Sequence, residues 1–129
     1  MAQGADITVN DGTATPVAVV FKIVQASPSL SIWKDKRLGS KSAQWPEITL
    51  SANIPGPKTT VRKAEQRIAV PVIDTLTGTV VDVCRARIVY DLPVSATNQN
   101  LNDLYAFTMN SVAHALIKGA VRDLDTIVG

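Results

Sequence analysis

The sequence has little of what disulfide bonding, membrane insertion or secretion requires. It has one cysteine, Cys84, so no disulfide can form within a chain. Its longest apolar runs, such as Val17 to Phe21 and Ile68 to Ile73, are far shorter than the ~20 residues of a membrane-spanning helix. The N-terminus lacks the charged-then-apolar pattern of a secretion signal. We therefore expect a soluble protein that is made in the cytosol and has no membrane partner.

Residues for catalysis or metal binding are equally sparse. The single histidine, His114, has no Asp, Glu or Cys three or four residues away, so it has no catalytic or metal-ligating neighbour on a helix face. The glycines form no phosphate-binding loop, and no paired carboxylates recur on one face. We predict no enzyme, no metal site and no cofactor. Cys84 lies in a strand-like stretch, where a buried, inert thiol is expected.

Charge is nearly balanced, with a net charge of only +2, so the whole chain is no polycation. The distribution is uneven, however, because 11 of the 13 Lys and Arg residues lie between Lys22 and Arg87. An ordinary solvated surface and a basic binding surface both fit this composition.

What is present is a pattern of short strands. The length of 129 residues and the hydrophobic content of 46% predict a single domain over residues 1–129. In the first two thirds, alternating or β-branched runs are separated by the Gly, Pro, Ser and Asp of turns, which predicts antiparallel strands that begin with a hairpin. The expected strands are Ile7 to Val9, Pro16 to Val24, Ser29 to Lys36, Glu47 to Asn53, Val61 to Ile73 and Thr79 to Val94. The expected turns are Arg37 to Ser42, Pro55 to Lys58 and Asp74 to Gly78.

The last third changes period, because apolar residues from Leu101 to Leu116 recur at helical spacing. Asn98 or Asn100 is the expected N-cap, Gly119 is expected to end this helix, and a second short helix follows. The helix is apolar around more of its circumference than a surface helix. This breadth favours packing against more than its own sheet, and a partner chain is one explanation.

Strand alternation divides the predicted sheet into two faces. The apolar face is expected to be covered by the helices of this α+β fold, which leaves a polar, mainly basic face open. Side chains on the open face could donate hydrogen bonds to phosphates and base edges. They are Lys34, Thr49, Ser51, Asn53, Lys63, Arg67, Arg85 and Arg87.

Three short motifs carry a resemblance to a known family. They are Ser31 to Trp33, Ile68 to Pro71, and Leu92 to Asn98. Together with the order of elements, they resemble the coat proteins of single-stranded RNA bacteriophages. The resemblance implies an N-terminal β-hairpin, a five-stranded antiparallel sheet and two C-terminal helices, in an intertwined homodimer whose sheets join edge to edge.

The family resemblance also implies a function. Dimers would self-assemble in the bacterial host cytoplasm into an icosahedral virion shell of T=3 symmetry, with single-stranded viral RNA on the inner sheet face. Some members also repress translation by binding an RNA hairpin. The expected dimer-interface residues in the long helix are Leu104, Phe107, Thr108, Val112 and Leu116. The loop Asp74 to Gly78, which joins neighbouring subunits in the family, is short here.

The family's RNA-contacting positions correspond to Leu30, Thr49, Ser51, Glu65, Arg67, Arg85 and Arg87. Glu65 stands where the family has a hydroxyl, and Arg85 where it has an aromatic side chain that stacks on a base. These departures favour RNA packaging through the backbone over recognition of a specific hairpin. Two other functions are alternatives to a coat protein: a free dimeric RNA-binding regulator, and a small-molecule-binding or catalytic α+β domain.

Overall fold

The computed structural model describes residues 4–37, 41–53, 56–58, 60–124 and 126–128. The predicted turns Arg37 to Ser42 and Pro55 to Lys58 lie partly outside these residues. The chain divides into two compact units, Met1–Asp91 and Leu92–Gly129. The first holds the sheet and the second the helices. A single domain and a helical cover over the apolar face both stay predictions.

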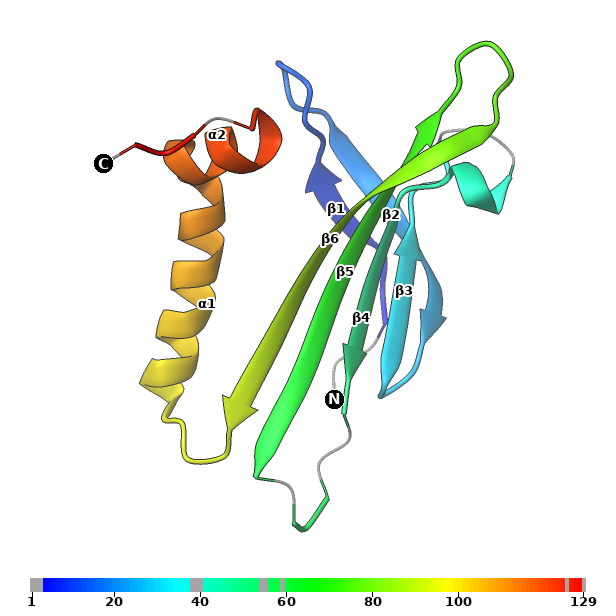
Figure 1. Cartoon of the computed structure of the whole chain (residues 1–129). Coiled ribbons are helices and arrows are strands. Elements are labelled where there is room, and N and C mark those ends of the chain that lie inside the picture. Colours follow the sequence, from blue (N-terminus) through cyan, green and yellow to red (C-terminus); the bar gives the residue numbers. More distant parts are fainter. Residues whose placement is uncertain (1–3, 38–40, 54–55, 59, 125, 129) are drawn as a thin grey trace. The chain divides into compact units, whose positions relative to one another are not determined.

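The first unit is built on one antiparallel sheet of six strands, arranged in sequence order (Figure 1). Neighbours along the chain are thus neighbours in the sheet, and no crossover connection is needed. The strands are β1 (Ile7–Asn10), β2 (Ala18–Ala26), β3 (Leu30–Lys34), β4 (Glu47–Ala52), β5 (Val61–Ile73) and β6 (Val80–Pro93). All six predicted strands are confirmed.

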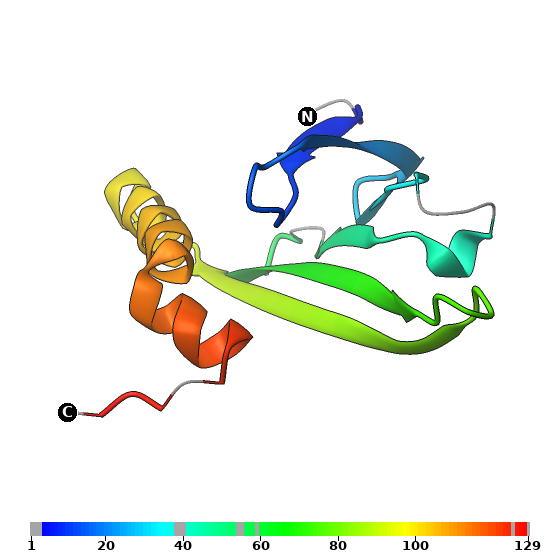
Figure 2. The same cartoon turned by 90° about the horizontal axis from the view of Figure 1, so that it is seen from above.

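Strand β2 belongs to both the hairpin and the main sheet. Its first half, Ala18 to Phe21, pairs with β1, and its second half, from Lys22, pairs with β3. The pairing with β3 shifts register between Ile23 and Gln25, and such a bulge bends a strand. Figure 2 shows the sheet curled like a half-barrel, so that β1 and β2 lie opposite β5 and β6 across the curl. The implied hairpin and five-stranded sheet therefore share one strand, and the total is six.

The turn between β5 and β6 is closed by its own hydrogen bonds. The Gly78 N–H donates to the Asp74 carbonyl at 2.7 Å, and the Asp74 N–H donates to the Thr79 carbonyl at 2.9 Å. Gly78 has a φ of 70°, a conformation that residues with a Cβ seldom adopt. The Gln44 side chain, from the 3₁₀ turn η1 (Ser42–Gln44), donates to the Gly78 carbonyl at 2.5 Å. The predicted turn is therefore a compact one, tied to the β3–β4 connection.

Few side chains are buried in the single chain. Among the described residues, the buried hydrophobic side chains are Val19 and Ile48, and Asp35 is the buried charged one. Large apolar side chains on the strands, such as Val70 and Val72, are more than two-fifths exposed. One face of a sheet of this size is normally packed against other elements. Here much of the apolar surface of the sheet is exposed in the single chain.

The second unit consists of α1 (Asn98–Ala113) and α2 (Ala115–Arg122). Thr97 caps α1: its hydroxyl accepts the Asn100 N–H at 3.2 Å, and the Asn100 side chain accepts the Thr97 N–H at 3.0 Å. This reciprocal pair is a capping box. The N-cap is therefore Thr97, one residue before Asn98. Asn100, the other expected N-cap, takes part in the cap through its side chain. In the part of the chain that the structure describes, neither helix is long and apolar enough to cross a membrane.

His114 interrupts the helical unit, so the prediction that one helix runs to Gly119 is wrong. Its backbone is extended, with φ −68° and ψ 139°, and its Nδ1 accepts the Leu116 N–H at 3.2 Å. The imidazole thus satisfies a backbone donor at the start of α2, as an N-cap side chain does. Gly119 lies inside α2 and accepts the Asp123 N–H at 3.0 Å.

The prediction of a buried Cys84 is also wrong, because its thiol is exposed. Of its two neighbours in β6, Val83 is half-buried and Arg85 is exposed. β6 is the last strand of the sheet and has a neighbour on one side alone within the chain. Strand alternation places Cys84 opposite Arg85, on the apolar face that the single chain leaves largely exposed.

Candidate nucleic-acid interface

Strand register brings the predicted polar residues of β4 and β5 onto one face. Thr49 lies opposite Arg67, and Ser51 lies opposite Glu65. Directly opposed residues of antiparallel strands point to the same side of a sheet. β3 continues this face, because Leu30 lies opposite Ser51. Five of the positions implied by the family resemblance are therefore neighbours, and we call their side of the sheet the polar face.

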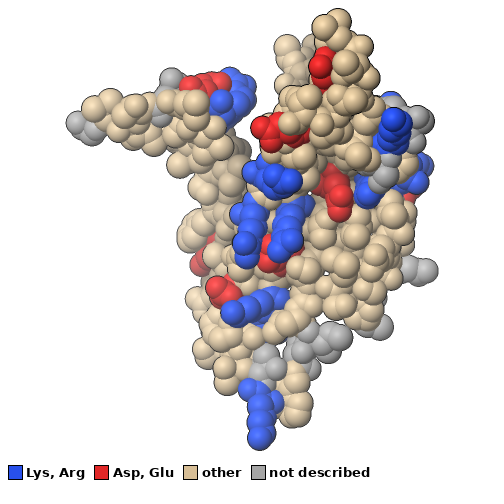
Figure 3. Space-filling model, turned by 45° about the vertical axis from the view of Figure 1, so that its right-hand side comes forward, with Lys and Arg blue, Asp and Glu red and all other residues tan. Residues whose placement is uncertain are grey.

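Glu65 joins two arginines at the centre of the polar face. Its Oε1 accepts from Arg67 Nε on the same strand, and Arg87 Nε on β6 lies 2.9 Å from the same oxygen. The hydrogen bond from Arg67 is the main cause that lowers the pKa of Glu65 below its ordinary 4.5, and the charge of Arg87 adds to it. Figure 3 shows Lys and Arg side chains gathered over the sheet with acidic side chains among them. The polar face is thus basic, but the Glu65 carboxylate neutralises part of the positive charge of its arginines.

A second ion pair lies at the other end of β4. Lys34 Nζ is 3.9 Å from Glu47 Oε2, and the Thr49 hydroxyl donates to Glu47 Oε1 at 2.9 Å. The Lys34 side chain is 19% exposed, whereas those of Arg67 and Arg87 are 62% and 64% exposed. The arginines are therefore more accessible to a ligand than this lysine. Sequence reasoning missed Glu47 as a member of the face, although its alternation with Thr49 could have found it.

The remaining predicted residues lie at the margins of this cluster. The Asn53 side chain accepts the Lys63 N–H at 2.7 Å, which closes the end of the β4–β5 ladder. The Lys63 side chain is exposed, as is that of Arg85. Arg85 is two residues before Arg87 on β6, so strand alternation places it on the same face. The cluster therefore offers two exposed cations from β5, Lys63 and Arg67, and two from β6 to one surface. Arg62 has the opposite strand parity and lies outside the cluster.

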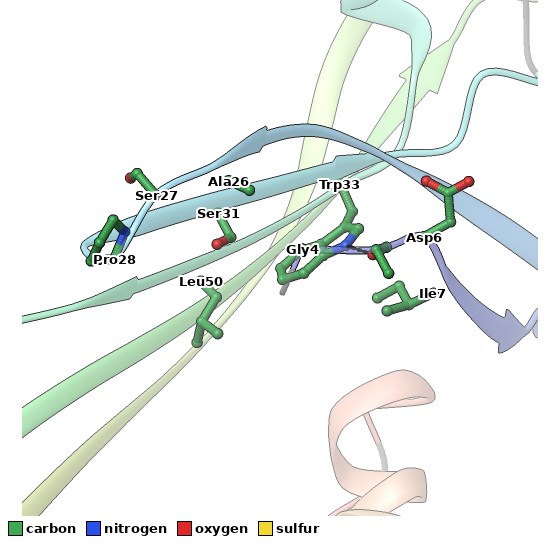
Figure 4. Close-up of a pocket in the computed structure, with 10 residues that line it drawn as sticks. Gly4, Asp6, Ile7, Ala26, Ser27, Pro28, Ser31, Trp33 and Leu50 are labelled. Carbon is green, nitrogen blue, oxygen red and sulfur yellow. Dashed lines mark hydrogen bonds between the residues drawn. The ribbon is translucent and has the colours of Figure 1, made fainter. Parts of the chain in front are cut away.

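The opposite face is apolar and includes a cavity of about 450 Å³ beside Trp33 (Figure 4). The Trp33 indole donates to the Ala5 carbonyl at 2.8 Å, so the N-terminal segment lies against β3. A Cβ on Gly4 would come within 2.6 Å of the side chains of Ala26 and Ile23, so this close approach requires glycine. The cavity lining has no histidine, cysteine or paired carboxylates with which to perform chemistry. Within the described ranges, no group of three potential metal ligands occurs either.

The sheet, the two helices and the basic polar face agree with the fold expected from the family resemblance. The sequence model of the levivirus coat protein family matches residues 2–127, which is nearly the whole chain. The chain belongs to the levivirus coat protein family. It is a capsid protein, a component of the virion, and the family's role is structural.

Solved structures of similar fold support this assignment. The virus-like particle of bacteriophage ESE058 matches with a TM-score of 0.86 and 22% identity, over 98% of this chain and 100% of that chain. The particle of bacteriophage NT-214 matches with a TM-score of 0.84 and 25% identity, over 98% and 100%. The protein capsid of bacteriophage GA matches at 0.68 and 14%, over 95% and 96%. Among curated proteins, none gives a significant match. The coat protein fold therefore persists although most side chains differ.

Proposed function

We propose that this coat protein forms homodimers that assemble in the bacterial cytoplasm into an icosahedral shell, with single-stranded viral RNA held on the polar face. The observation that carries the RNA part is the Arg67–Glu65–Arg87 cluster, in which two arginines from neighbouring strands are both exposed. Guanidinium groups suit phosphate because they present several donors in a fixed plane. RNA lining the shell would meet this face.

The dimer rests on apolar surface that the single chain leaves exposed. In α1, the side chains of Leu104, Phe107 and Val112 are 40%, 70% and 58% exposed, and Leu116 in α2 is 60% exposed. Monomeric soluble proteins rarely leave so much contiguous apolar surface in water. A partner chain that covers these residues, together with the half-buried Thr108, would bring the helices of two subunits together.

The edge strand β6 gives the dimer a second contact. Within the chain it pairs with β5 on one side, so its outer backbone groups are available to another strand. Pairing of β6 with its copy would join two six-stranded sheets into one. It would also cover Cys84 and extend the polar face of one subunit, with its Arg85 and Arg87, into that of the other.

Packaging here would depend on the phosphate backbone more than on base sequence. Arg67 and Arg87 are suited to phosphates, whereas Glu65 would repel them, and the flexible side chain of Arg85 is no aromatic platform for a base. We therefore favour general RNA packaging over translational repression through a specific RNA hairpin. A shell of T=3 symmetry is the architecture that the family resemblance implies.

Expression of the chain alone tests this function. We expect nuclease-resistant particles of uniform diameter by negative-stain electron microscopy, with RNA that can be extracted from them. A discrete dimer that binds RNA but forms no particle at any salt concentration would instead identify a free RNA-binding regulator. A monomer that binds no RNA would contradict both.

A further inference from the structure

The Glu65 carboxylate contacts two arginines and is less exposed than either of them. Its side chain is 18% exposed, whereas those of Arg67 and Arg87 are 62% and 64% exposed. The two arginines reach it from different strands, β5 and β6, and both use Nε to contact Oε1. The Glu65 side chain is thus largely covered, whereas the two arginines that contact its carboxylate remain open to solvent.

The position of Glu65 sets the charge of this cluster. Two arginines and one carboxylate sum to +1, where the arginines alone would give +2. The lowered pKa of Glu65 keeps its carboxylate ionised at neutral pH. A phosphate that approaches the arginines therefore meets an anion already bound to both of them.

Stability gives little reason for an acid at this position. The arginine partners are mostly exposed, and ion pairs of exposed side chains contribute little to folding because water screens them. Thr49 and Ser51, the neighbours of Arg67 and Glu65 in β4, show that this face accepts uncharged polar residues. The effect of Glu65 on a bound anion is therefore larger than its effect on the fold.

We propose that Glu65 is an internal counter-anion of the RNA-binding face, which occupies Arg67 and Arg87 in the free subunit and competes with RNA phosphates for them. The proposal rests on the RNA-binding function proposed above. Glu65 acts through the two guanidinium groups that contact its carboxylate, and it lowers their affinity for phosphate. A shell of many subunits can hold RNA with weak contacts at each one, because the contacts act together along one strand.

The test measures RNA binding by the full-length chain as a function of salt. The probe is a fluorescein-labelled single-stranded oligouridylate, followed by fluorescence anisotropy. Glu65→Gln removes the charge and keeps the side-chain size, so we expect roughly fivefold tighter binding at low salt. It adds about one effective cation per chain, so the slope of log affinity against log salt should steepen by about 0.7, an extra loss of about 2.5-fold from ~50 to ~200 mM.

Two further variants separate this effect from others. Glu65→Thr removes the same charge with a residue of high strand propensity, and it should give the same change if Glu65→Gln misfolds. Asp123→Asn makes an equal change of net charge at the Arg122–Asp123 pair in the helical unit and should leave binding unchanged.

The outcomes distinguish this proposal from the one on which it rests. If Arg67→Ala with Arg87→Ala weakens binding but neither Glu65 variant changes the affinity or its salt slope, the counter-anion role is wrong and the RNA face stands. Weaker binding by both Glu65 variants would also overturn it. If the double arginine variant binds RNA as the wild type does, the face itself is misassigned.

Discussion

Asp35 is buried at the end of β3 with both carboxylate oxygens bound to one arginine. Arg37 Nε lies 3.0 Å from Oδ1, and Arg37 Nη2 lies 3.0 Å from Oδ2, while the Arg37 N–H also donates to Oδ1 at 3.1 Å. The Asp35 N–H donates to the Pro46 carbonyl at 2.9 Å. The Asp35–Arg37 pair therefore lies at the start of the β3–β4 connection, and the Asp35 backbone joins it to Pro46, the residue before β4. The pair lies outside the Arg67–Glu65–Arg87 cluster, and we expect its role to be in the fold.

We expect Asp35→Ala to lower the free energy of unfolding by about 1–3 kcal/mol, because it removes a buried acceptor from several hydrogen bonds. Urea denaturation of the unassembled chain, followed by circular dichroism, measures this difference. Asp82→Ala is the matched control, since Asp82 is exposed and its carboxylate accepts from the adjacent Val83 N–H. Equal stability of Asp35→Ala and Asp82→Ala would show that the buried pair adds nothing.

The sequence predicted the strands well because each is a short alternating run between turn residues, and turns such as Asp74 to Gly78 have strong local signals. Strand alternation also predicted that Arg67 and Arg87 share a face, and their common contact with Glu65 agrees with it. Local patterns are reliable where backbone geometry alone decides which way a side chain points.

The errors come from contacts that a pattern does not contain. His114 interrupts the helix because its imidazole caps α2, and histidine is not a usual helix breaker. Cys84 is exposed because the single chain leaves much of the apolar face of the sheet uncovered, which alternation along one strand does not reveal. The contact of one Glu65 oxygen with two arginines required the register of β5 with β6. Such features follow from tertiary structure and not from spacing along the chain.

Acid should destabilise the N-terminal hairpin through two aspartates. Asp6 accepts the Ile23 N–H at 2.8 Å, and Asp11 accepts the Val17 N–H at 2.9 Å. These backbone hydrogen bonds are the main causes that lower the pKa of each carboxyl below its ordinary 3.8. Because the pKa is lower in the folded chain, their stabilisation is present above 3.8 and is lost as the pH falls below it.

Thermal melting as a function of pH measures this loss. The Tm of the wild type should fall as the pH drops below 3.8, and Asp6→Asn with Asp11→Asn should make this part of the curve flatter. The double variant should already be less stable at neutral pH, because its amides cannot provide the same charged acceptor. An unchanged acid slope in the variant would show that other groups control acid unfolding.

Phe107 should be an anchor of the dimer. Its side chain is 70% exposed in the single chain, and large aromatic residues at the centre of an interface often carry much of its binding free energy. We expect Phe107→Ala to weaken dimerisation by about 2 kcal/mol, roughly a 30-fold rise in Kd. Sedimentation equilibrium of the unassembled chain measures the change. Asn102→Ala in the same helix is the control, and a similar Kd for both variants would remove Phe107 from the interface.

The arginines of the polar face should control RNA content without controlling assembly. Arg67→Ala with Arg87→Ala removes two exposed cations, so particles of this variant should contain less RNA, measured as the ratio of absorbance at the nucleic-acid and protein maxima. Dimers should still form, because the proposed dimer contacts use the helix side chains and the backbone of β6, and not the side chains of Arg67 and Arg87. Arg62→Ala with Arg122→Ala removes the same charge from outside the cluster: Arg62 has the opposite strand parity, and Arg122 pairs with Asp123. If both double variants lose RNA equally, the net charge of the chain determines the RNA content of the shell. A loss confined to Arg67 and Arg87 would show that the direction of the charges matters more than their number, as a net charge of +2 requires.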